Sequence, residues 1–173
     1  MKVLFIGLGG VGQRHLRNSI ALLDEIEIHA FRKRGLKSEV TDTLDKNDDE
    51  DIESKYSIVT HNSIDDALSV NPSAVIIANP SSMHFGVLKS CLEKNIPCFV
   101  EKPMVTNSAG VDELLELANF GVKHSMVGFQ LRYSPVIQKL KEIIEDGSLG
   151  KVLSCRAEVC EYMPGFHPYE DYR

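Results

Sequence analysis

The sequence reads MKVLFIGLGGVG from Met1 to Gly12, and this stretch decides the fold. Its apolar run, Val3 to Ile6, is rich in β-branched and aromatic residues, which is typical of a strand buried on both faces of a parallel sheet. The glycines that follow have the spacing G-x-G-x-x-G. In this setting the first glycine permits a tight turn, the second lets a pyrophosphate approach the backbone, and the third lets the next helix pack closely. The stretch therefore predicts a dinucleotide-binding turn at a helix N-terminus, in preference to a plain strand–turn–helix corner.

The composition is that of an ordinary globular protein. The chain has 173 residues, 43% of them hydrophobic and 25% charged, a length that suits one domain with a real core and is short for two. Its formal net charge of -6 argues against nucleic acid as a general partner. No run reaches the roughly 20 apolar residues of a membrane span, and no targeting segment precedes the first strand. We therefore expect a cytoplasmic protein that does not bind membranes.

Neither the cysteines nor the acidic residues have a metal-binding spacing. The four cysteines, Cys91, Cys98, Cys155 and Cys160, form no C-x-x-C pair. We expect them to be reduced and mostly buried, with no zinc site and no redox dithiol. The segment 36–57 is polar and acidic but lacks the spacing of a calcium loop, so it predicts a solvated, mobile helix or loop.

Short apolar runs alternate with amphipathic stretches through the rest of the first 132 residues. Further strands are predicted over 25–31, 57–60, 74–78, 97–100 and 123–128. Together with the first strand they predict an α/β fold, a Rossmann-type doubly wound parallel sheet, over residues 1–132.

The pattern changes after Arg132. Residues 135–146 have helical periodicity, whereas 151–162 alternate between apolar and polar side chains, as in a strand of a one-sided antiparallel sheet. Residues 133–173 are therefore predicted to be a linker helix and the first strand of a truncated α+β substrate domain. Because that strand lacks neighbours, we expect it to be disordered, folded back on the first domain, or paired with a second copy in a homo-oligomer.

The residues after the second strand bear on the choice of cofactor. A dinucleotide fold normally has an acid about 20 residues past the glycines, where it binds the adenosine ribose. Here Phe31 is followed by Arg32, Lys33 and Arg34, and the next carboxylate is Glu39. Because a guanidinium can bind a 2′-phosphate in bidentate fashion, the segment favours NADP over NAD. A basic turn that merely ends the strand is the alternative.

Polar side chains also follow three later strands, at the sheet edge where doubly wound folds bind ligands. Lys102 is the predicted catalytic residue, because a lysine beside the nicotinamide can move a proton to or from a substrate hydroxyl while the hydride moves. For His84, which opens a helix, a capping or packing role is an equal alternative. The predicted cofactor-binding residues are Gly7, Leu8, Gly9, Gly10, Val11, Gly12, Arg32, Lys33, Arg34, Asn79, Pro80, Ser81, His84, Glu101, Lys102, Gln130 and Arg132.

Three motifs together resemble the Gfo/Idh/MocA oxidoreductases, the family of glucose–fructose oxidoreductase and inositol dehydrogenase. They are the glycine turn, the sequence Glu101-Lys102-Pro103 and the stretch GFQLRY over 128–133, in that order. The resemblance covers Met1 to about Tyr162. It implies a nicotinamide-dependent dehydrogenase acting on a sugar, a sugar derivative or a polyol, with Lys102 as the catalytic lysine and a cis bond before Pro103.

The resemblance also implies a large mixed sheet and a helix carrying an Asp and a His that complete the active site. Those residues would lie beyond Arg173, so we expect this chain alone to bind nucleotide without dehydrogenating a substrate. Two other classes stay open from the sequence. One is a different Rossmann reductase, of the dihydrodipicolinate or biliverdin reductase type, and the other is a nucleotide-sensing protein without turnover.

Overall fold

The computed structural model describes residues 1–35, 37–120, 124–160 and 162. The chain divides into two compact units, Met1–Gly128 and Phe129–Arg173, whereas the sequence analysis places a domain boundary between residues 132 and 133. The first unit contains the predicted cofactor-binding residues except Gln130 and Arg132, which lie in the second.

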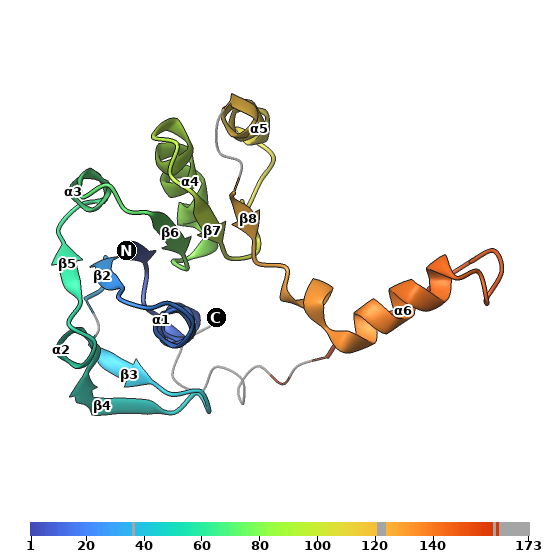
Figure 1. The fold of residues 1–173 in the computed structure, drawn as a ribbon, viewed down its shortest axis with the longest axis horizontal. Coiled ribbons are helices and arrows are strands. Elements are labelled where there is room, and N and C mark those ends of the chain that lie inside the picture. Colours follow the sequence, from blue (N-terminus) through green and yellow to red (C-terminus); the bar gives the residue numbers. More distant parts are fainter. Residues whose placement is uncertain (36, 121–123, 161, 163–173) are drawn as a thin grey trace. The chain divides into compact units, whose positions relative to one another are not determined.

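The first unit is built on a six-stranded parallel sheet with the order β5-β2-β1-β6-β7-β8 (Figure 1). The strands are β1 (Lys2–Ile6), β2 (Glu27–Phe31), β5 (Val59–His61), β6 (Ala74–Ile77), β7 (Cys98–Val100) and β8 (Met126–Val127). The strand order reverses beside β1, which is where doubly wound sheets bind their ligands. The predicted parallel α/β sheet is confirmed, although Lys123 of the predicted sixth strand lies outside the described residues.

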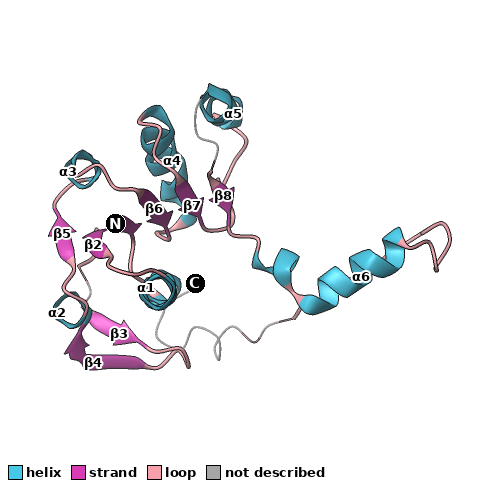
Figure 2. Cartoon of the chain, viewed as in Figure 1, coloured by secondary structure: helices cyan, strands magenta, loops and turns pink. Residues whose placement is uncertain are grey.

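Helices cover both faces of this sheet (Figure 2). They are α1 (Gly10–Leu22), α2 (Ile52–Lys55), α3 (Ile64–Ser69), α4 (His84–Glu93) and α5 (Val111–Phe120), with the short 3-10 helix η1 (Ser81–Met83) before α4. Alternate side chains of β1 enter two different cores. Val3 and Phe5 pack with Leu16 of α1, while Leu4 and Ile6 pack with residues of α3, α4 and α5. A strand buried on both faces in this way explains the unbroken apolar run of β1.

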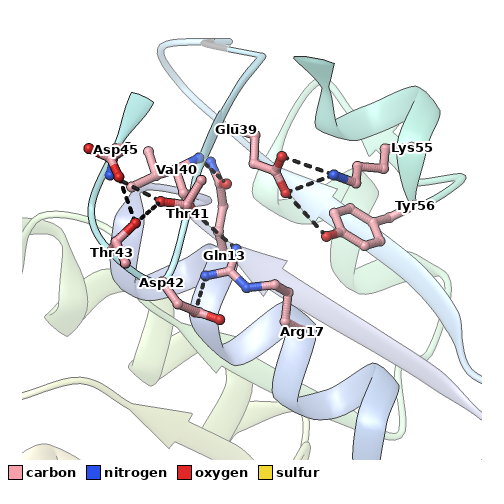
Figure 3. A network of polar contacts seen from close by, with 10 residues as sticks. All are labelled: Gln13, Arg17, Glu39, Val40, Thr41, Asp42, Thr43, Asp45, Lys55 and Tyr56. Atoms are coloured by element: carbon pink, nitrogen blue, oxygen red, sulfur yellow. Dashed lines mark hydrogen bonds and ion pairs between the residues drawn. The ribbon is translucent and has the colours of Figure 1, made fainter. Parts of the chain in front are cut away.

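The acidic segment forms a β-hairpin, so its prediction as a mobile helix or loop was wrong. Strand β3 (Ser38–Val40) pairs antiparallel with β4 (Lys46–Asp51), and α2 follows directly. Gln13 of α1, outside the segment, bonds to β3, and within the segment the Lys55 ammonium lies 2.9 Å from the carboxylate of the buried Glu39 (Figure 3). Composition reports neither the contact from Gln13, on a distant helix, nor the pairing of β3 with β4, so it gave no sign of the hairpin.

The second unit contains the 3-10 helix η2 (Gln130–Tyr133) and α6 (Pro135–Glu145), as expected for a helix with proline in its first turn. The strand predicted over 151–162 is absent from the residues that the structure describes there, 151–160 and 162. A strand needs a hydrogen-bonded neighbour, and no described segment supplies one. Its apolar side chains Leu153 and Val159 are exposed. Residues 161 and 163–173 lie outside the described part.

The cysteines differ from one another in burial. Cys91 and Cys98 are buried, and the neighbouring Cys98 thiol together with burial raises the pKa of Cys91. Cys155 and Cys160 are exposed, so the prediction of mostly buried cysteines was wrong for this pair, whose apolar alternation has no sheet to face. Within the described residues no three His, Cys, Asp or Glu side chains gather as a metal site would require, and no helix combines the length and apolarity that crossing a membrane demands.

Candidate functional site

The glycine turn between β1 and α1 has the three properties that its spacing predicts. Gly7 has φ +90°, and a Cβ there would lie 2.8 Å from the backbone nitrogen of Asn79. A Cβ on Gly12 would lie 2.3 Å from the carbonyl oxygen of Gly7, so only glycine lets the helix approach this closely. A Cβ on Gly9, in contrast, would meet no described atom within 4 Å. Gly9 therefore opens onto free space in front of the helix.

Open space at the N-terminus of a helix is the environment in which dinucleotide folds bind phosphates. Gly9 is the N-cap of α1, and no side chain caps the helix there, so the amides of the first turn are available to an anion. Asn79, after β6, supplies a second sign: its Oδ1 atom is buried and has no hydrogen-bond partner among the described residues. Unpartnered buried acceptors are rare in folded proteins, and a ligand hydroxyl or amide would satisfy this one.

Gln13 is a site residue that the sequence analysis missed. It is 2% exposed, and its Nε2 donates to the carbonyl oxygens of Leu8 in the glycine turn and Ser38 in β3, at 3.1 and 3.0 Å. The amide of Val40 donates to its Oε1 at 2.7 Å (Figure 3). Gln13 thus connects the turn to the hairpin. Its neighbours in sequence carry no signal of this, because both partners in the hairpin are more than twenty residues away.

His84, at the start of α4, is buried between two loops of the predicted site. It is 1% exposed, with Nδ1 2.9 Å from the carbonyl oxygen of Pro103 and Nε2 2.8 Å from that of Asn79. Both ring nitrogens therefore face backbone acceptors. This geometry makes His84 a positioning residue that holds the loop after β6 against the loop after β7.

Glu101 and Lys102 follow β7, and the Lys102–Pro103 peptide bond is cis, as the resemblance implies. His15 of α1 donates from Nε2 to Glu101 Oε1 at 2.8 Å, and this bond holds the pKa of Glu101 below its usual value. The Lys102 amide donates to the other carboxylate oxygen at 3.2 Å. The Lys102 side chain is exposed, and within the described residues its ammonium forms no ion pair. An exposed amine beside a fixed carboxylate is available to a substrate.

The basic residues after β2 do not act as one group. Arg32 Nη1 donates to Glu53 Oε1 of α2 at 2.8 Å, and the two side chains are only 7% and 17% exposed. Lys33 and Arg34 are exposed. The amide of Gly7 donates to the Phe31 carbonyl at 3.0 Å, which places this strand end beside the glycine turn.

The other predicted residues are distributed between the two units. Leu8, in the glycine turn, is buried, and Val11, in the first turn of α1, is exposed. Pro80 and Ser81 lie at the start of η1. Gln130 and Arg132 lie in η2 of the second unit, where both are exposed. All the other predicted cofactor-binding residues belong to the first unit.

Comparison with known proteins gives a consistent result. A family model for GFO_IDH_MocA, described as an oxidoreductase family with an NAD-binding Rossmann fold, matches residues 1–129. The inositol 2-dehydrogenase of Streptomyces avermitilis is 28% identical over 168 residues, which are 95% of this chain and 46% of that protein. The myo-inositol 2-dehydrogenase of Thermotoga maritima is 28% identical over 87% of this chain and 42% of its own length. The chain thus spans less than half the length of these curated relatives.

Solved structures share the fold. The myo-inositol 2-dehydrogenase of Lactobacillus plantarum superposes with a TM-score of 0.70 at 23% identity, over 88% of this chain and 43% of that one. The scyllo-inositol dehydrogenase of Lactobacillus casei, solved with NAD(H) and scyllo-inositol, gives a TM-score of 0.66 at 19% identity, over 87% and 42% of the two chains.

Proposed function

The chain belongs to the Gfo/Idh/MocA family of oxidoreductases with an NAD-binding Rossmann fold, and on that premise we propose that it binds a nicotinamide dinucleotide for the oxidation or reduction of a polyol or sugar. The observation that carries the proposal is the turn from Gly7 to Gly12, with its open position at Gly9 and the unpartnered Asn79 Oδ1 beside it. The relatives that are inositol dehydrogenases support a polyol as the substrate class.

We assign the proton transfer to Lys102. When bound, the nicotinamide accepts or gives the hydride at the substrate carbon. Lys102 takes the proton of the substrate hydroxyl as the carbonyl forms, and returns it in the reverse direction. Glu101, fixed by His15, holds the Lys102 backbone through the bond from its amide. His84 Nδ1 contacts the carbonyl oxygen of Pro103, the residue after Lys102, so the loop that carries the lysine is fixed on both sides of it.

For the cofactor we propose tighter binding of NADPH than of NADH. Lys33 and Arg34 are exposed at the strand end where a Rossmann fold places the adenosine ribose, and a 2′-phosphate would gain charge-assisted hydrogen bonds from them. Because both side chains are exposed and solvent screens their charges, the two together are expected to contribute about 1.5 kcal/mol.

Replacing both Lys33 and Arg34 by alanine is expected to weaken NADPH binding roughly tenfold and NADH binding far less, because only NADPH carries the extra phosphate. Calorimetric titration of both nucleotides measures this. The double variant of Lys94 and Lys139 to alanine removes the same charge from exposed positions elsewhere and is the matched control. Equal affinity of the wild-type chain for NADH and NADPH would contradict the proposed preference.

We also propose that the protein self-associates. In the second unit, α6 exposes Val136, Leu140 and Ile144, and clustered apolar side chains of this kind favour association. Light scattering is expected to give a mass above the 19.3 kDa of one chain, and replacing Val136 and Leu140 by serine is expected to lower it. A monomeric wild-type chain at high concentration would speak against self-association.

A further inference from the structure

The residue after β2, Arg32, forms an ion pair with Glu53 that has no role in the function proposed above. Arg32 follows β2 directly, and its Nη1 donates to Glu53 Oε1 at 2.8 Å. Within the described part of the chain, Glu53 is the one acceptor found for this guanidinium. The side chains are 7% and 17% exposed, so their attraction is screened far less than that of a surface pair.

Glu53 is held in place by more than Arg32. The Lys37 ammonium lies 2.9 Å from its other carboxylate oxygen, and this contact raises the pKa of Lys37. The preceding residue, Ile52, is fully buried in the core, and the Glu53 amide donates to Asp51 Oδ1 at 2.9 Å. The carboxylate is therefore fixed between two cations, at the start of α2.

Its location matters because the residue after β2 faces the adenosine ribose in doubly wound dinucleotide folds. The 2′-phosphate of NADPH brings up to two negative charges, which Arg32 can bind only by sharing or releasing the Glu53 carboxylate. Glu53 itself repels such a phosphate. The 2′-hydroxyl of NADH carries no charge and meets neither effect.

We propose that Glu53 is a specificity-determining residue, which sets the balance between NADPH and NADH by competing with the 2′-phosphate for Arg32. The inference rests on the proposed function, since it requires that the adenosine end of a dinucleotide binds beside β2. Specificity of this kind comes from an attractive and a repulsive group acting together. Here Lys33 and Arg34 attract the phosphate, while Glu53 limits what Arg32 contributes.

The variant Glu53→Gln tests this directly, because it removes the charge and keeps the size and a hydrogen-bonding oxygen. In the 173-residue chain we expect NADPH to bind about tenfold more tightly and NADH to change by less than about threefold, measured by calorimetric titration. In an Arg32→Met background the same substitution is expected to change the NADPH:NADH ratio much less, because only the direct repulsion between Glu53 and the phosphate then remains. A double-mutant cycle of this form isolates the coupling of Glu53 to Arg32.

The matched control is Glu50→Gln, which makes the same charge change in β4, where Glu50 lies 3.7 Å from Lys55 and does not contact Arg32. It is expected to leave both affinities unchanged. If thermal unfolding shows that Glu53→Gln does not fold, Glu53→Asp withdraws the carboxylate by one methylene and is expected to tighten NADPH by a smaller factor. An unchanged NADPH affinity in a folded Glu53 variant, or an equal gain in Glu50→Gln, would overturn the proposal. A wild-type chain that binds neither nucleotide would instead contradict the proposed function itself.

Discussion

Replacing Lys102 by methionine is expected to lower turnover by a factor on the order of 10²–10⁴, because a positioned acid–base group contributes about that much to a reaction that moves a proton. Methionine keeps the apolar stem and removes the amine. Cofactor affinity is expected to change by less than about threefold, since the proposed phosphate site is the glycine turn and not Lys102. Turnover is measured with myo-inositol and both oxidised nucleotides, on a polypeptide in which this chain is followed by a substrate domain of its family.

Lys102→Arg is the control that separates charge from proton transfer. Arginine retains the positive charge but does not give up its proton in proteins, so it is expected to be as inactive as methionine. If Lys102→Arg keeps most of the turnover, the lysine acts only as a charge. If the methionine variant keeps it, Lys102 is an exposed residue at a strand end and the acid–base group lies elsewhere. A nucleotide-sensing protein would show binding and no turnover in any of the variants.

Replacing Gly9 by valine is expected to weaken the binding of both nucleotides about a hundredfold or more. The side chain would fill the free space in front of α1 and keep the pyrophosphate from the backbone amides, each of which contributes about 1.5–3 kcal/mol with a charged acceptor. The fold is expected to tolerate the change. Gly9 has φ -72° and ψ -170°, which any residue adopts, and the loss of a glycine N-cap costs about 1 kcal/mol at most.

Gly86→Ala in α4 is the matched control, because a Cβ there also meets no described atom within 4 Å. It is expected to leave nucleotide affinity unchanged and to stabilise the helix by roughly 0.5–1 kcal/mol. Calorimetric titration and thermal unfolding of both variants separate binding from stability. Wild-type affinity in the folded Gly9→Val variant would show that no phosphate lies at this turn.

The glycine turn could be predicted from sequence because two of its glycines, Gly7 and Gly12, answer local steric requirements. Gly7 has a positive φ, and a Cβ on Gly12 would clash with the carbonyl oxygen of Gly7. Both constraints act within a dozen residues, so spacing alone reveals them. The buried run of β1 is local in the same sense, because both faces of that one strand are covered.

The partners of the site's charged residues could not be predicted, because they come from distant parts of the chain. Glu53 lies 21 residues after Arg32, and Glu101 lies 86 residues after His15. Neither distance follows from a local periodicity. The sequence therefore groups Arg32 with Lys33 and Arg34 as side chains for a 2′-phosphate, whereas Arg32 is paired with Glu53 and nearly buried.

Over residues 151–162 the apolar and polar side chains alternate as in a strand, but the described residues there form no strand. Leu153 and Val159 alternate with polar residues, but a strand is defined by its hydrogen-bonded neighbour, and no described segment provides one. Periodicity reports which side chains would share a face. It does not report whether a second strand is present.

Because Gln13 bonds to both the glycine turn and the hairpin β3–β4, opening of the hairpin is coupled to the state of the turn. The Val40 amide can exchange its hydrogen with deuterated solvent only when its bond to the Gln13 side chain opens, and the same side chain holds the Leu8 carbonyl of the turn. We expect a nucleotide bound at the turn to slow exchange of this amide, in a hairpin that the nucleotide need not touch. Hydrogen exchange of the Val40 amide would then report nucleotide binding in the absence of any substrate.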